Sequence, residues 1–231
     1  DVQKSFLPKG LPKVAGYEFF GHYEPAQEVG GDYYDFIPLS DGKWGAMIGD
    51  VAGKGVPAAL MMAKVRAEAR FCMLTEPTLA EAMSKLNEQM EDAGMIDRFV
   101  TFGAAVVDPR NHQVTFANAG HFPPTIYRKA KNAFESGMDS EMGGLPLGVV
   151  QGMPYDEVTV DLGVGDIVLQ FTDGVTEAVN KDGKQFSLEA VTQCLKDVAK
   201  NPKTMVEHLV NAVKQHAQGC KQFDDITVIA F

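Results

Sequence analysis

The sequence has few cysteines and no long apolar run. Its three cysteines, Cys72, Cys194 and Cys220, lie far apart and form no CxxC pair, so neither a disulfide framework nor a zinc site is indicated. No stretch of about 18 apolar residues occurs, which argues against a membrane-spanning helix and leaves no visible signal peptide. These absences favour a reducing, cytoplasmic location. The chain begins with Asp1 rather than Met, and we therefore expect a fragment of a longer protein.

Basic residues are also scarce. Lys and Arg number 21 against 31 Asp and Glu, a net charge of −10. Because no basic run is long enough to follow a phosphate backbone, nucleic-acid binding is not expected. The acidic excess fits either ordinary solubility or partial neutralisation by bound cations. No linker-like segment or internal repeat divides the 231 residues, of which 45% are hydrophobic, so the sequence predicts one compact domain.

Strand-like and helix-like segments follow one another in blocks. Alternating apolar and β-branched residues predict strands at 14–23, 33–39, 44–48, 99–107, 114–118, 125–128, 157–160, 167–171 and 226–231, those from 99 to 128 forming a meander. Helical spacing predicts helices over 56–73, 187–199 and 204–217, with another beginning at a Thr78 to Glu81 capping box. The first helix is expected to bury a stripe that includes Leu60, Phe71 and Leu74. Residues 129–144, rich in Gly and Lys, are expected to form a flexible flap.

The order of these segments differs from the strict strand and helix alternation of a parallel doubly wound sheet. It favours an α+β fold, a four-layer α-β-β-α sandwich with two mainly antiparallel sheets covered outside by helices. An α+β domain with a single sheet is the alternative.

Four acidic motifs lie far apart, each beside an apolar, strand-like run: GD at 31–32, GD at 49–50, TDG at 172–174 and DD at 224–225. Taken singly, each has a plain alternative, because Gly and Asp are common turn formers. A fold that gathers several carboxylates needs a divalent cation to offset their repulsion, and all-oxygen ligation points to Mg²⁺ or Mn²⁺. The motifs therefore make Asp32, Asp50, Asp173 and Asp224 the candidate site residues.

The GDVAGKG segment at 49–55 is not a nucleotide-binding phosphate loop. Such a loop needs four residues between its glycines and a Ser or Thr after the lysine. Here three residues intervene, and Gly55 follows Lys54. The segment fits better as a strand end at which Asp50 binds a metal and the glycines allow close backbone approach.

Six motifs, in order along almost the whole chain, resemble those of the metal-dependent serine/threonine protein phosphatases of the 2C type. They are EVGGDYYDF (28–36), GDVAGKGVPAAL (49–60), FANAGHFPP (116–124), GLPLGVV (144–150), FTDGVTEA (171–178) and DDITVIAF (224–231). The bacterial branch that includes RsbU and the sporulation phosphatase is the nearest in pattern. This resemblance implies a binuclear Mg²⁺ or Mn²⁺ centre at one end of two central sheets. Asp50 would bridge two ions, the Val51 carbonyl would add to one, and Asp173 and Asp224 would hold the other.

Other positions match the family less simply. Asp32 matches the acidic residue of the first motif, and the resemblance implies that it binds an ion directly or through water. Asp225 aligns with a position that is less often a ligand, so its role stays open. Ala52 stands where eukaryotic relatives carry the histidine thought to protonate the leaving group. His121 is expected to have a structural hydrogen-bonding role, and no phosphate-binding arginine is evident.

The chemistry implied is hydrolysis of phosphoserine or phosphothreonine on a protein by a metal-activated water, with no protein nucleophile. The absence of a Cys-x₅-Arg loop agrees with this route. The alternatives are a catalytically weak phosphatase-like binding module and a small-molecule phosphomonoesterase.

The resemblance also implies partners and domain boundaries. The substrate would be a phosphoprotein, such as a small anti-sigma antagonist, in sigma-factor or two-component signalling. Residues 1–12 would end a linker from an upstream sensor or receiver domain, and 13–231 would form the phosphatase domain. A homodimer is also considered.

Overall fold

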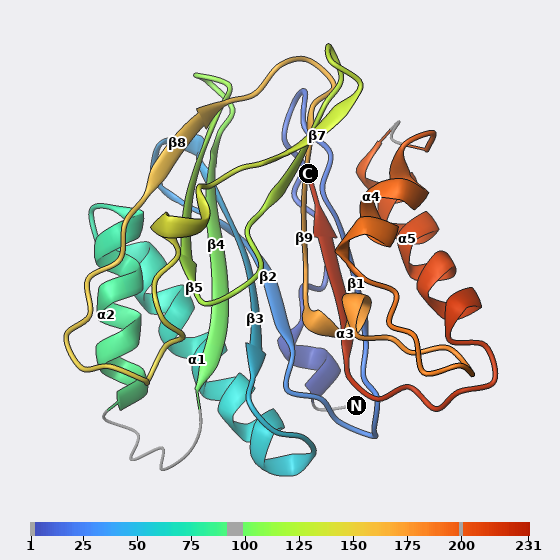
Figure 1. Cartoon of the computed structure of the whole chain (residues 1–231). Helices are drawn as coiled ribbons and strands as arrows, with labels where there is room; N and C mark the ends of the chain where they lie inside the picture. Colours follow the sequence, from blue (N-terminus) through green and yellow to red (C-terminus); the bar gives the residue numbers. More distant parts are fainter. Residues whose placement is uncertain (1–2, 92–98, 199–200) are drawn as a thin grey trace.

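The computed structural model describes residues 3–91, 99–198 and 201–231, and within them two five-stranded sheets pack face to face (Figure 1). One sheet contains, in spatial order, β1 (Phe20–Glu24), β10 (Ile226–Ala230), β9 (Ile167–Phe171), β6 (Thr125–Arg128) and β7 (Ala133–Ser136). The other contains β2 (Tyr33–Pro38), β3 (Trp44–Val51), β4 (Val100–Asp108), β5 (Gln113–Ala119) and β8 (Val158–Asp161). Neighbouring strands pair antiparallel throughout both sheets.

Helices cover the outer face of each sheet (Figure 1). α1 (Val56–Thr75) and α2 (Leu79–Glu91) pack on the β2 to β8 sheet, whereas α4 (Leu188–Leu195) and α5 (Pro202–His216) pack on the sheet that contains β10. Each layer boundary has its own apolar core, represented by Met62 under α1, Ile229 between the sheets and Leu209 under α5. The four-layer α+β prediction is therefore confirmed, and the single-sheet alternative is wrong.

Local sequence signals explain where the first two helices begin. Pro57 lies in the first turn of α1, where a missing N–H costs nothing. At α2, the Glu81 carboxylate accepts a hydrogen bond from the Thr78 N–H at 3.1 Å, and the Thr78 hydroxyl accepts one from the Glu81 N–H at 3.2 Å. This reciprocal pair is the predicted capping box.

Several predicted elements differ from the structure. The strand expected at 14–23 is limited to β1, and the meander expected over 99–128 breaks because β6 joins the opposite sheet, beside β9. The expected flap at 129–144 is wrong in part, since it contains β7, which pairs with β6, and a short 3₁₀ turn, Ser140–Met142. α4 ends at Leu195 rather than near 199, and residues 199–200 lie outside the described residues. The sheet that a short strand joins is decided by tertiary packing. The spacing of apolar residues along the chain carries no information on that packing.

The buried face of α1 is also not the predicted one. Leu60, Phe71 and Leu74 are exposed, at 69%, 55% and 59%. The helix instead buries a stripe of smaller or flexible side chains that includes Ala58, Met62, Val65, Ala69 and Cys72. Both stripes satisfy helical spacing, so periodicity alone does not decide which one faces the sheet.

No helix in the described ranges is long and apolar enough to cross a membrane.

Candidate metal centre

The topology brings all the acidic motifs to one end of the sandwich. Asp32 directly precedes β2 and Asp50 lies near the end of β3, and these strands pair antiparallel with Tyr33 opposite Gly49. In the other sheet, Asp173 follows β9 and opens the short helix α3 (Asp173–Thr176), while Asp224 lies just before β10. Antiparallel pairing places one strand's end beside the next strand's start. Carboxylates separated by up to 192 residues in the chain, from Asp32 to Asp224, therefore lie at the same end of the sandwich.

Asp32 joins the two sheets through hydrogen bonds. Its side chain is buried, and Oδ2 accepts hydrogen bonds from the hydroxyls of Thr172 at 2.8 Å and Thr227 at 2.5 Å. Thr172 directly follows β9, and Thr227 lies in β10, so both donors come from the opposite sheet or its strand end. Burial, with the nearby charges of Asp50 and Asp225, raises its pKa well above the ordinary value despite these donors. The two hydroxyl donors therefore fix the orientation of the Asp32 carboxyl group, while burial and neighbouring charges disfavour its charged form.

Asp50 and Asp173 face the same crowded region. Burial raises the pKa of Asp50 from 3.8 to about 7, with added repulsion from Asp173 and Asp224. Burial likewise raises the pKa of Asp173 to about 6, with repulsion from Asp224 and Glu177. Repulsion from neighbouring carboxylates thus adds to the effect of burial on both groups, as expected where several anionic side chains face one region.

Asp225 has a different role from the other aspartates. Its Oδ1 accepts from the Ala26 N–H at 2.8 Å, and its Oδ2 accepts from the Gly31 N–H at 2.7 Å and the Asp32 N–H at 3.3 Å. Both carboxylate oxygens therefore anchor the loop that precedes β2. A Cβ on Gly30 would lie 2.0 Å from Asp225 Oδ2, so this close approach requires glycine.

Asp224 is paired with a lysine that the sequence analysis did not assign to the site. The Lys54 ammonium lies 2.8 Å from Asp224 Oδ2, 3.6 Å from the centre of the Phe223 ring, and donates to the Phe223 carbonyl. Lys54 also favours the charged form of Asp173. In this arrangement the ammonium supplies part of the positive charge that the cluster needs. In the sequence, the only sign of this role is that Lys54 lies four residues after Asp50.

The donor chemistry of the cluster fits a hard divalent cation. Its oxygens come from carboxylates, and the Val51 carbonyl lies beside Gly31, where a Cβ would approach it to 3.0 Å. Within the described ranges, however, no three His, Cys, Asp or Glu side chains are gathered at metal-ligand spacing. The raised pKa values of Asp50 and Asp173 are compatible with this wider spacing, because repulsion between carboxylates acts over longer distances than direct coordination of one ion. Asp32, Asp224 and Asp225 are held by hydroxyls, an ammonium and backbone N–H groups instead.

His121 lies beside the cluster, in a cavity that it shares with Asp50, Asp173 and Glu177. Its Nδ1 is 3.0 Å from the Thr101 hydroxyl, and its backbone N–H donates to the Asn118 side chain at 2.8 Å. Burial lowers the pKa of the imidazole to about 4, so the ring is neutral at pH 7. These bonds agree with the expected structural role. The sequence predicts no role for Glu177, which follows α3, because the FTDGVTEA motif contains no signal that distinguishes it from an ordinary surface glutamate.

Comparisons with known structures identify the fold as that of the PP2C phosphatases. The SiaA PP2C domain of Pseudomonas aeruginosa superposes with a TM-score of 0.85 at 23% identity, covering 100% of this chain and 92% of that one. The PP2C phosphatase domain of SpoIIE from Bacillus subtilis gives a TM-score of 0.78 at 20% identity, covering 93% and 63%.

Sequence comparison gives the family. The profile of the family Stage II sporulation protein E (SpoIIE) matches residues 40–231, and the chain belongs to this family. Phosphoserine phosphatase RsbU of Bacillus subtilis (strain 168) is 28% identical over 229 residues, covering 99% of this chain and 67% of RsbU. Protein IcfG of Synechocystis is 26% identical over 258 residues, covering 99% of this chain but 40% of IcfG. The predicted resemblance is confirmed, and the chain is a serine/threonine protein phosphatase.

Proposed function

We propose that this chain hydrolyses phosphoserine or phosphothreonine on a protein, using two Mg²⁺ or Mn²⁺ ions held at the aspartate cluster. The observation that carries the proposal is the convergence of Asp32, Asp50 and Asp173 from both sheets, with the pKa of each carboxyl raised. A purely structural cluster gains nothing from such repulsion. A cluster that binds cations gains affinity from it.

The proposed roles of the aspartates and of the Val51 carbonyl in metal binding differ. Asp50, Asp173, Asp224 and the Val51 carbonyl would hold the ions, and Asp32, fixed by its two threonine donors, would bind directly or through water. When bound, the ions lower the pKa of a water and offset the negative charge that develops on the phosphoryl oxygens.

Proton delivery to the leaving group is not assigned to His121. Its pKa of about 4 leaves it neutral at pH 7, and a general acid needs a pKa near the working pH. His121 would instead orient the Thr101 hydroxyl at the edge of the site.

The substrate is proposed to be a small phosphorylated regulator, such as an anti-sigma antagonist, in sigma-factor or two-component signalling in a bacterial cytoplasm. The support is the similarity to RsbU, whose name records phosphoserine as its substrate, and to SpoIIE. A phosphatase-like binding module and a small-molecule phosphomonoesterase are the competing functions, and selective action on a phosphoprotein separates them from the proposal.

We also propose that residues 1–12 end a linker from an upstream sensor or receiver domain and that 13–231 form the phosphatase domain. The exposed apolar side chains of α1, which include Val56 and Leu60 at 64% and 69%, support contact with such a domain or with a second copy.

The test is metal-dependent turnover of a phosphoserine peptide and of p-nitrophenyl phosphate. Asp173→Asn should lower turnover by at least about 10²-fold, the size of losing one electrostatic catalytic element. Asp50→Asn and excess EDTA should have similar or larger effects. Asp156→Asn, at an exposed position, is the matched control and should leave turnover unchanged. Wild-type rates in EDTA or in Asp50→Asn would contradict the two-metal proposal.

A further inference from the structure

A pocket of about 320 Å³ opens beside the candidate metal centre. Its walls come from α3, the last turn of α5 and the segment 217–224 that leads into β10. Buried Val213 and Ile226, with half-buried Ala178, Val179 and Ala217, give it an apolar lining. A pocket of this size with a mainly apolar wall and a few polar groups has room for one large apolar side chain.

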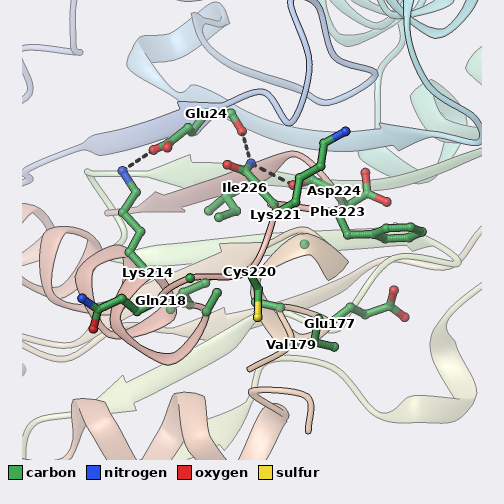
Figure 2. A pocket seen from close by; sticks show the side chains of 16 residues that line it. Glu24, Glu177, Val179, Lys214, Gln218, Cys220, Lys221, Phe223, Asp224 and Ile226 are labelled. Carbon is green, nitrogen blue, oxygen red and sulfur yellow. Dashed lines mark hydrogen bonds and ion pairs between the residues drawn. The ribbon is translucent and has the colours of Figure 1, made fainter. Parts of the chain in front are cut away.

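The pocket runs out from the site itself. Figure 2 shows Asp224 and Glu177 on one side of it and Lys214 and Gln218 on the other. Asp224 is a proposed metal ligand and Glu177 also lines the cavity of Asp50 and Asp173. A ligand in the pocket would therefore extend directly from a group bound at the aspartates.

Hydrogen bonds and an ion pair hold the pocket's walls in place. Lys214 Nζ lies 2.5 Å from Glu24 Oε2, so the C-terminal end of α5 is fixed to β1. Gln222 Nε2 donates to the Glu24 carbonyl at 3.0 Å and to the Asp224 carbonyl at 2.9 Å. The pocket is thus formed before any ligand arrives, which lowers the entropic cost of binding.

We propose that this pocket binds an apolar side chain of the phosphoprotein substrate, one that flanks the phosphoserine by one or two residues. The inference rests on the proposed function and adds a specificity site to it. An extended chain advances roughly 3.5 Å per residue, so a neighbour of a phosphoserine bound at the proposed metal site reaches the adjoining pocket, whose wall includes the proposed metal ligand Asp224. Burial of that side chain gives affinity, and the position of the pocket selects where in the substrate it must stand.

Alanine-based phosphoserine peptides provide the probe. Each carries a single leucine at position −2, −1, +1 or +2 from the phosphoserine, and kcat/KM is compared with that of the all-alanine peptide. We expect about a tenfold preference for leucine at one of these positions, equivalent to about 1.4 kcal/mol. Ala217→Trp, which fills the pocket, should reduce that ratio to about one.

The ratio is taken within each variant, so differences in overall turnover cancel. Ala130→Trp, in the exposed turn between β6 and β7, is the matched control and should keep the tenfold preference. Hydrolysis of all peptides without a leucine preference, or an equal preference in wild type and Ala217→Trp, overturns the pocket proposal alone. If neither the peptides nor p-nitrophenyl phosphate are hydrolysed, the proposed function is overturned together with the pocket proposal.

A second measurement avoids any folding defect of Ala217→Trp. Cys220 is half-buried in the pocket wall, whereas Cys72 is buried. In a Cys194→Ala background, methanethiosulfonate reagents of increasing size should attach to folded protein at Cys220. The leucine preference should fall as the reagent grows. A preference that is independent of reagent size, with mass spectrometry showing full labelling of Cys220, contradicts the proposal.

Discussion

At the residue scale, the aspartates are most informative through their pKa values, which predict how metal-free protein responds to pH. Asp50 has a folded-state pKa of about 7 against an ordinary 3.8. The folded state therefore holds a proton that the unfolded state has released. The associated stability is fully present below about pH 4 and is lost as pH rises through about 7.

We accordingly predict that the free energy of unfolding in EDTA falls between about pH 4 and 7. One proton corresponds to at most about 1.4 kcal/mol per pH unit. Urea denaturation across this range measures the slope, and Asp50→Asn should make it shallower, with exposed Asp156→Asn as control. A slope that is the same in Asp50→Asn and wild type would place the titrating groups elsewhere.

Lys54 allows a second prediction for a single residue. Its ammonium pairs with Asp224 and lowers the pKa of Asp173, so it competes with a cation for the same carboxylates. Lys54→Met should strengthen Mn²⁺ binding by roughly 3- to 10-fold, since a single partly exposed ion pair has a modest effect. Isothermal titration calorimetry measures this. Lys203→Met, which removes an equal charge from α5, controls for net charge, and equal effects of the two variants would argue against competition at Asp224.

At the scale of elements, an ion pair between half-buried Arg70 and buried Asp35 joins α1 to β2. The Asp35 carboxylate is 2% exposed and accepts hydrogen bonds from Arg70 of α1 at 2.5 Å and the Tyr33 hydroxyl at 3.1 Å. Arg70→Ala should lower the free energy of unfolding by about 2–3 kcal/mol, because Asp35 would stay buried without its cation. Arg66→Ala is the control on the same helix, since Arg66 donates to the neutral Phe6 carbonyl, and denaturant unfolding should show a smaller loss. Equal losses would show that Asp35 does not need Arg70.

The same scale shows why some elements could be predicted from the sequence and others could not. The bounds of β2 and β9 agree with the prediction nearly to the residue, because continuous apolar runs end at clear turn signals, whereas β3 extends beyond the predicted 44–48 to Val51. The sheet membership of β6 was not, since it depends on packing against β9, some forty residues later. α1 carries two apolar stripes, and only its contact with the sheet decides that Met62, not Leu60, is buried.

The residues of the candidate site also differ in whether the sequence predicts them. The convergence of Asp32, Asp50 and Asp173 could be predicted, because each acidic residue lies beside an apolar, strand-like run, and their role as metal ligands stays a prediction. Lys54 and Glu177 could not, as their link to the site is purely spatial. The pocket at Cys220 brings together side chains from Glu24 to Ile226, and no local pattern of residues encodes such an assembly.

At the scale of the whole molecule, the aspartate cluster lies where both sheets end, so a bound cation would stabilise their packing together. Asp32 and its donors Thr172 and Thr227 already connect the sheets there. We predict that Mn²⁺ at about 100 times its dissociation constant raises the free energy of unfolding by about 2.7 kcal/mol. For a chain of this size that corresponds to a Tm increase of roughly 5–10 °C.

Differential scanning calorimetry with and without Mn²⁺ measures this increase. It should shrink in Asp50→Asn, because one repulsive charge and one ligand are removed together, so that apo protein becomes more stable while metal binds less tightly. Asp156→Asn should keep the full increase, since that exposed carboxylate does not belong to the cluster. An identical metal response in Asp50→Asn and wild type would place the cation elsewhere on the acidic surface. Dependence on Asp50 would instead tie the stability of both sheets to the ions that the catalytic chemistry requires.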